Sequence, residues 1–156
     1  MSERLIPYIV FLPIERKQRV LQAIFGSLIP IDILKFSINQ GISKKIYQKD
    51  LIKSLDYSNK TIIGYLKKLT DLGVLEEHME KTESLGRTVW VKYYLLSDLG
   101  RWFALLLAKE EALSREEKAE ILSSVFRSYA KWLKEFAEKL GVKKEDLQGI
   151  FAKEMG

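Results

Sequence analysis

Cysteine is absent from this chain of 156 residues, and histidine occurs once, at His78. The lack of thiols excludes disulfide scaffolds, thiol redox chemistry and thiolate metal sites. A Ser-His-Asp triad or an imidazole metal site would depend on His78 alone. The sequence also has no motif for a phosphate-cradling glycine loop or an activated nucleophile. We therefore expect no enzymatic activity, no catalytic residues, no cofactor and no metal site.

Long hydrophobic runs are also lacking. The longest one, Leu5–Ile14, is interrupted by Pro7 and Pro13 and is too short to span a bilayer. It lacks the basic leader and the small-residue cleavage site of a signal peptide. The sequence therefore predicts a cytoplasmic protein without a membrane partner.

The charge is unevenly distributed along the chain. The formal net charge is +5, from 26 basic and 21 acidic residues. Seven lysines and two aspartates lie between Ser43 and Lys68, so this segment holds the whole excess and the remainder is balanced. A concentrated basic patch favours a polyanionic partner. A solvated, lysine-rich helix face would have the same composition, and charge alone does not separate the two interpretations.

Hydrophobic periodicity predicts a mainly helical chain. The expected helices are Glu15–Phe25, Leu28–Asn39, Lys45–Ser54, Asn59–Leu72, a helix that starts after Ser97 and runs to about Ala112, a long helix that starts after Ser114 and ends at Gly141, and a short one over Lys143–Lys153. The buried side of the Asn59–Leu72 helix is expected to contain Ile62, Ile63, Leu66 and Leu69. Ser58 is placed to cap this helix and Gly73 to end it. Ser114 and Glu117 have the spacing of a capping box.

One region changes to the alternating pattern of strands. Thr88–Leu96 is rich in β-branched and aromatic residues, and Val74–Met79 is its expected antiparallel partner. The polar segment Glu80–Arg87, which contains Gly86, is predicted to be the hairpin loop. The predicted fold class is therefore mainly α with a small β-hairpin.

Three helices followed by a hairpin is the element order of a winged helix-turn-helix. Residues Gln48–Glu77 resemble the signature stretch of winged helix-turn-helix transcription regulators, particularly the ArsR/MarR-type proteins of bacteria and archaea. The matching positions are Leu51, Leu55, Ser58, Ile62, Leu66 to Leu69 and Leu72 to Leu75. Tyr94–Gly100 is similar to the family's exit from the wing into the next helix, and the resemblance covers roughly Val20–Leu107.

The resemblance implies a homodimeric, sequence-specific regulator of transcription whose partner is double-stranded DNA. The implied division is an N-terminal apolar segment (1–14), a winged helix-turn-helix DNA-binding domain (15–112) and C-terminal dimerisation helices (113–156). Metal-sensing members of the family use cysteine or histidine clusters, which this chain lacks, so thiolate metal sensing does not carry over. Any small-molecule effector is unknown. The alternative function is a winged-helix module for protein–protein interaction without specific DNA binding.

Polar and basic residues around the implied recognition helix are the candidate DNA contacts. They are Ser58, Asn59, Lys60 and Thr61 at its start, Tyr65, Lys67 and Lys68 further along, Lys44, Lys45 and Lys49 near the supporting helix, and Arg87 at the wing tip. Arginine suits a narrow minor groove because the negative potential is strongest there. Capping alone would also explain Ser58. The glutamates of the wing, Glu76, Glu77, Glu80 and Glu83, would repel phosphates if turned toward them.

The last long helix carries apolar residues at alternating spacings of three and four, which is a heptad seam. The predicted dimer interface consists of Leu122, Phe126, Tyr129, Leu133, Phe136 and Leu140. Two recognition helices would then read two half-sites of a near-palindrome. Packing of this seam on the chain's own domain is the alternative.

Overall fold

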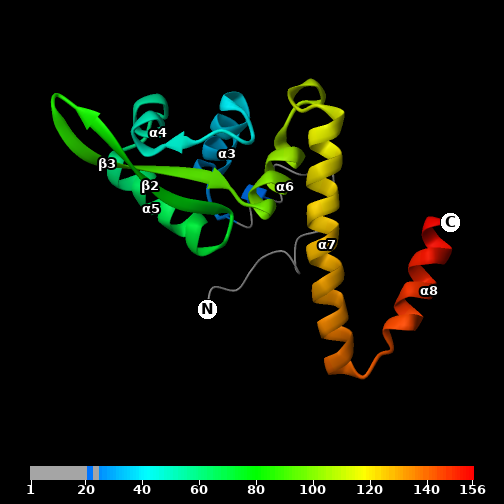
Figure 1. Cartoon of the computed structure of the whole chain (residues 1–156). Coiled ribbons are helices and arrows are strands. Elements are labelled where there is room, and N and C mark those ends of the chain that lie inside the picture. Colours follow the sequence, from blue (N-terminus) through cyan, green and yellow to red (C-terminus); the bar gives the residue numbers. More distant parts are fainter. Residues whose placement is uncertain (1–20, 23–24) are drawn as a thin grey trace.

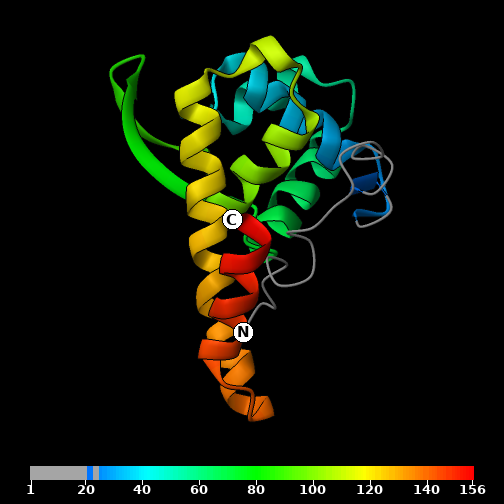
Figure 2. The same ribbon diagram turned by 90° about the vertical axis from the view of Figure 1, so that its right-hand side faces the viewer.

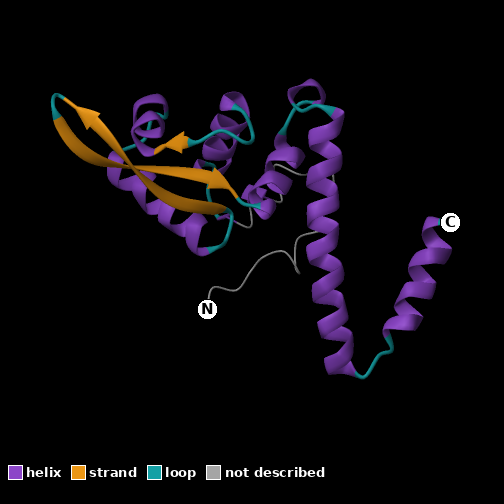
Figure 3. Ribbon diagram, viewed as in Figure 1, coloured by secondary structure: helices purple, strands orange, loops and turns teal. Residues whose placement is uncertain are grey.

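The computed structural model describes residues 21–22 and 25–156. The chain is mainly helical, with one small antiparallel sheet of three strands (Figures 1 and 3). This confirms the predicted class of a mainly α protein with a β-hairpin. The apolar segment Leu5–Ile14 and most of the expected helix Glu15–Phe25 lie outside the described residues.

The elements follow one another with short connections. In chain order they are α3 (Ile29–Gln40), β1 (Ile46–Tyr47), α4 (Gln48–Ser54), α5 (Asn59–Asp71), β2 (Leu75–Ser84), β3 (Arg87–Leu96), α6 (Asp98–Leu107), a 3-10 turn (Glu110–Ala112), α7 (Arg115–Leu140) and α8 (Lys144–Met155). The strand order in the sheet is β1-β3-β2.

The predicted helix boundaries are confirmed where a capping residue marks them. The hydroxyl of Ser58 accepts a hydrogen bond from the backbone N–H of Thr61 at 3.2 Å, which caps α5. Both hydrogen bonds of the Ser114–Glu117 capping box are present at the start of α7. Gly141 ends α7 in the left-handed conformation, with φ 73°. Local sequence therefore sets these ends.

Two helix predictions are wrong at one end. Ile46 and Tyr47, expected in a helix, form the strand β1 and pair with Tyr94 and Tyr93. Their β-branched and aromatic side chains suit a strand, and a neighbouring strand end is available to pair with. The helix expected to reach Ala112 is split, because α6 ends at residue 107 and a separate 3-10 turn follows.

The hairpin is longer than predicted. Residues 80–84, expected in a loop, continue β2, and only Leu85 and Gly86 form the turn. Both turn residues have positive φ, 52° and 75°, as two-residue hairpin turns with a primed geometry require. The polar composition indicated a loop. That composition equally suits strands exposed to solvent. The distal hairpin is exposed because it projects beyond α4 and α5, on the side away from α7 (Figure 1).

The core lies between the inner face of the sheet and the helices. Ile46, Leu75, Tyr94 and Leu96 point from the sheet into one cluster with residues of α3, α4, α5 and α6. Phe25 packs edge-to-face on Phe103 of α6, with ring centroids 5.6 Å apart. Burial of such side chains is the main stabilising contribution to this arrangement.

The ends of the hairpin meet at one tight junction. The hydroxyl of Ser97, the residue that caps α6, donates to the carbonyl oxygens of Gly73 and Val74 and accepts from the N–H of Gly100. The N–H of Ser97 also donates to the Val74 carbonyl at 3.1 Å. A Cβ added to Gly100 would overlap that same oxygen. The first turn of α6 therefore lies directly on the backbone that links α5 to β2.

Helix α7 extends far beyond the core. Ile121 and Val125 in its first half are buried, and Ile121 joins the core cluster beside α6. The second half runs past the core, and the chain then turns back into α8, which diverges from α7 at an angle (Figures 1 and 2). Within the described part of the chain, no helix is both long and apolar enough to cross a membrane.

We expect Gly100→Ala to lower the free energy of unfolding by about 2–3 kcal/mol, because the added methyl group must displace backbone. Urea denaturation measures this change. Gly149→Ala in α8 is the control, since a Cβ there meets no atom of the described residues within 4 Å, its chain neighbours and own helix backbone aside. A Gly100→Ala variant as stable as the wild type would contradict the tight junction.

Candidate nucleic-acid interface

Helix α5 has a clearly divided surface. Ile62, Leu66 and Leu69 are fully buried against the core. The hydroxyl of Tyr57, just before the helix, donates a 2.5 Å hydrogen bond to Asp32 of α3. This bond raises the pKa of Tyr57 above its ordinary value. The start of α5 is therefore held to α3 by a polar contact and its inner side by apolar packing.

The opposite side of α5 is open to solvent. Its exposed residues are Asn59, Lys60, Ile63, Gly64, Lys67, Lys68 and Asp71. The expectation that Ile63 is buried is wrong, because its side chain is 44% exposed. It lies one position from Ile62, about 100° around the helix, and so falls outside the buried stripe. Among the charged residues of α5, the only acid is Asp71 at its end.

The remaining predicted contacts on α5 are less free. The Ser58 hydroxyl, besides capping the helix, donates to the Thr61 hydroxyl at 2.7 Å. Thr61 and Tyr65 are half-buried. The ammonium of Lys68 lies 5.8 Å from the centroid of the Tyr65 ring. Three predicted contact residues of α5 are exposed and form no hydrogen bond or ring contact of this kind within the described residues. They are Asn59, Lys60 and Lys67.

The three predicted lysines near α4 differ from one another. Lys44 is exposed in the turn before β1. Lys45 forms a 2.8 Å ion pair with Glu80 of β2 and lies over the ring of Tyr93, 4.7 Å from its centroid. Lys49 in α4 lies 5.9 Å from the centroid of the Tyr47 ring. Lys45 is therefore occupied in holding the hairpin, whereas Lys44 is available to a partner.

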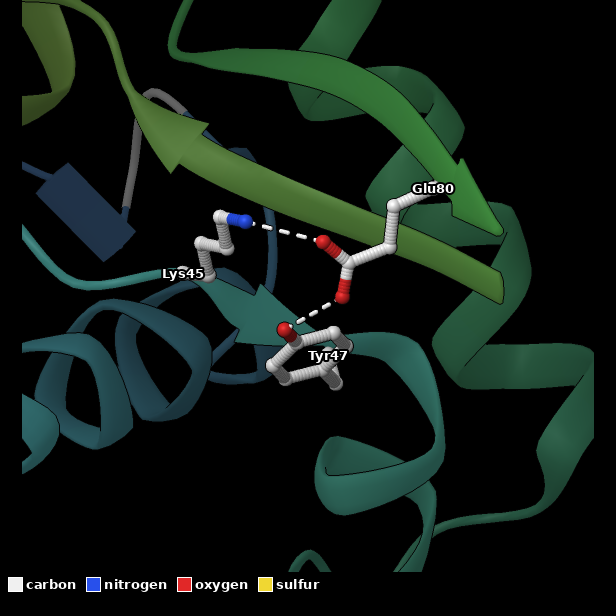
Figure 4. Close-up of polar contacts among 3 residues, drawn as sticks. All are labelled: Lys45, Tyr47 and Glu80. Atoms are coloured by element: carbon white, nitrogen blue, oxygen red, sulfur yellow. Dashed lines mark hydrogen bonds and ion pairs between the residues drawn. The ribbon is translucent and has the colours of Figure 1, made fainter. Parts of the chain in front are cut away.

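The Glu80 carboxylate connects β1 to the hairpin (Figure 4). One oxygen accepts from Lys45 and the other accepts a 2.5 Å hydrogen bond from the hydroxyl of Tyr47. Because both partners favour the ionised carboxylate, they hold the pKa of Glu80 below its ordinary value. Lys45 and Tyr47 correspondingly have raised pKa values, chiefly through the same hydrogen bonds.

Two of the four hairpin glutamates form ion pairs with lysine. Glu80 is paired with Lys45, and Glu77 forms a 2.9 Å ion pair with Lys92. A carboxylate oxygen of Glu76 lies 3.7 Å from the ring Nε2 of His78. The two lysines offset the charges of Glu77 and Glu80, so part of the expected phosphate repulsion is neutralised within the protein.

The distal half of the hairpin carries exposed basic and aromatic residues. Arg87 follows Gly86 directly at the tip and is exposed. Trp90 is 58% exposed, and its cross-strand partner Lys81 places its ammonium 5.1 Å from the ring centroid. The sequence alone does not predict this pair, because Lys81 lies in the segment expected to form the loop.

The predicted heptad seam of α7 lies on a different side from the residues that pack on the core. Leu122 and Leu140 are 55% and 62% exposed, Phe126 and Phe136 are also exposed, and Tyr129 and Leu133 are half-buried. Phe126 contacts Phe151 of α8, with ring centroids 5.3 Å apart. Helix α7 therefore has one apolar side packed on its own chain and a second that is largely uncovered by the described residues.

Within the described residues, no group of histidine and acidic side chains is arranged to hold a metal ion. No protein-family model matches the chain, and no curated protein matches it. The functional assignment therefore depends on the surfaces themselves.

We expect the ion pair at Glu80 to stabilise the fold at neutral pH and to fade in acid. A carboxyl with a lowered pKa in the folded state stabilises above its ordinary pKa, and this is lost as the pH falls through the lowered value. The difference in unfolding free energy between wild type and Glu80→Gln should thus be largest near pH 7 and small near pH 3.

Chemical denaturation at both pH values measures this difference. Glu83→Gln on the same strand is the control, because no ion pair of Glu83 is recorded within the described part of the chain. A Glu80→Gln effect that is equal at both pH values would show that the carboxylate does not act through its charge.

Proposed function

We propose that this protein is a winged helix-turn-helix transcription regulator that binds double-stranded DNA as a homodimer. Helix α5 is the recognition helix, placed in the major groove, and the β2–β3 hairpin is the wing on the flanking DNA. The observation that carries the proposal is the outer side of α5. That side is exposed and carries three lysines and the amide of Asn59. The inner side of the helix is fixed by Ile62, Leu66 and Leu69.

The dimensions of the elements support this proposal. A major groove about 12 Å wide admits one helix with its side chains. Exposed lysines then contact phosphates, which gives affinity, and an amide such as that of Asn59 reads a base edge, which gives specificity. The hairpin, which projects beyond α4 and α5, carries Arg87 at its tip, where it suits the minor groove (Figure 1).

The uncovered side of α7 supports the homodimer. Large apolar side chains that remain exposed on a soluble chain are typical of an interface. Their heptad spacing suits a helix–helix contact. A symmetric dimer would also present two copies of α5, and these would bind two half-sites of a near-palindrome.

The first test is the salt dependence of DNA binding. A duplex is enriched from random DNA with the wild-type protein, and its affinity is measured from low to moderate salt. With about three or four phosphates neutralised per subunit, log K against log salt should slope by about −5 to −7.

Lys67→Ala should reduce the magnitude of that slope by about 2, one phosphate per subunit. Asn59→Ala should instead lower affinity for the enriched duplex by about 1–3 kcal/mol at unchanged slope.

Lys109→Ala is the control for loss of a lysine, because this exposed residue follows α6 and lies outside the proposed interface. A flat salt response, or no binding at low salt, would refute the proposal. The alternative function, a protein–protein interaction module without specific DNA binding, would then be favoured.

The second test concerns the homodimer. Leu122→Glu combined with Phe136→Glu places charges on the uncovered side of α7. Burial of each large side chain contributes about 1.5–3 kcal/mol, and each substitution acts twice in a symmetric dimer. We expect a folded monomer with a sharply reduced DNA affinity, because each half-site is then bound without tethering.

Sedimentation and circular dichroism measure the assembly and the fold of this double variant. Lys131→Glu is the control, since it changes charge at an exposed position of α7 outside the seam. A double variant that stays dimeric would place the interface elsewhere. One that unfolds would assign the seam to the chain's own core.

A further inference from the structure

Gly64 occupies the middle of α5, where glycine weakens a helix. Glycine is the poorest helix former apart from proline, because it loses the most backbone freedom on folding. Its backbone there is ordinary, since it lies inside α5 and its φ is not positive. The left-handed conformations that require glycine at Gly73 and Gly86 therefore do not explain it.

Packing within the described residues does not explain this glycine either. A Cβ added to Gly64 would meet no atom of those residues within 4 Å, apart from its chain neighbours and its own helix backbone. Gly100 is the opposite case, because a Cβ there would strike the Val74 carbonyl. Alanine would thus fit at position 64 and strengthen the helix. The fold itself gives no reason for the missing side chain.

The position of Gly64 suggests that its missing side chain serves the contact of α5 with a partner. Helical spacing places Gly64 between Lys60, four residues before, and Lys67 and Lys68, three and four residues after. Ile63 stands beside it with its apolar side chain 44% exposed. The centre of the exposed side of α5 is therefore a bare stretch of backbone next to one apolar group, with lysines at both ends.

We propose that Gly64 is the point at which α5 comes closest to the bases in the major groove, and that Ile63 beside it contacts a thymine methyl group. This inference rests on the proposed function and names the residues that set its specificity. Without a side chain at position 64, the helix axis lies deeper in the groove, so short side chains reach base edges. An apolar side chain beside a T·A pair recognises the methyl group that cytosine lacks.

The charge on the exposed side of α5 favours DNA over an apolar protein surface as its binding partner. Every charged residue of α5 before Asp71 is a lysine, and the lysines flank the glycine on both sides. An apolar protein groove would leave these lysines without a counter-charge, and burial of an unpaired charge is costly. In a major groove, the phosphates along the two edges can pair with the lysines on either side of Gly64. The floor of the groove, where the base edges lie, is then free to approach the backbone at Gly64.

Gly64→Ala gives the test, because structure and function predict opposite effects. The variant should unfold about 2–4 °C higher than the wild type, since alanine is the better helix former. Its affinity for the duplex enriched with the wild-type protein should nevertheless fall about tenfold. Its affinity for random duplex DNA should change less than about twofold, because that binding depends mainly on phosphate contacts.

Two further variants sharpen the comparison. Gly149→Ala is the matched control, since this glycine is also exposed in a helix with open space around it. It should leave the affinity for the enriched duplex unchanged. Ile63→Ser should lower the preference for duplexes with a T·A pair over those with a C·G pair at the contacted position.

Each outcome bears on a separate claim. Wild-type protein without DNA binding would refute the proposed function and this inference with it. Binding by the wild type with undiminished affinity of Gly64→Ala would refute the inference alone. Equal losses on enriched and random duplexes, or a lowered melting temperature, would also overturn it, because each would give Gly64 another role.

Discussion

The contact of α6 with the backbone of Val74 is the constraint on which the arrangement of the molecule depends. Here Gly100 has no side chain, so the first turn of α6 lies against a carbonyl oxygen, and the Ser97 hydroxyl bonds the backbone of the α5–β2 link. This contact brings together the end of α5, the start of β2, the end of β3 and the start of α6. The position of the hairpin relative to α5 is therefore set by backbone atoms, which have little freedom to rearrange.

The second support of the hairpin lies at Glu80, about halfway along β2. Its carboxylate binds Tyr47 of the short strand β1 and Lys45 just before that strand. Exposed ion pairs contribute little energy on their own. Here the pair acts with the tight junction, because two separate points determine the direction of a strand. Under the proposed function, this explains why a lysine of the basic segment serves the fold and leaves the phosphates to Lys44, Lys60 and Lys67.

The sequence predicted those features that follow from local chemistry. Caps at Ser58 and Ser114 and the stop at Gly141 depend on neighbouring residues, so α5 and α7 were placed well. Strand β1 was missed because its pairing with Tyr93 and Tyr94 joins residues far apart in the chain. The exposure of Ile63 and the partner of Lys45 also depend on tertiary packing. The open space at Gly64 could not be foreseen, since a glycine in a helix looks the same in sequence whether it is crowded or bare.

The distal part of the hairpin projects from the molecule, so a small rotation at its base is magnified at its tip (Figure 1). Beyond the fixed point at Glu80, four residue pairs precede the turn at Leu85 and Gly86, and the distance from Glu80 to Leu85 along the strand is roughly 17 Å. A rotation of about 10° at that point would move the tip by about 3 Å, comparable to variations in groove width between sequences. Under the proposed function, such a rotation would let the tip follow the local width of the groove while the base of the hairpin stays attached at Ser97 and Glu80. Under that function, the same pair of strands would combine a fixed base beside the recognition helix with an adjustable tip on the flanking DNA.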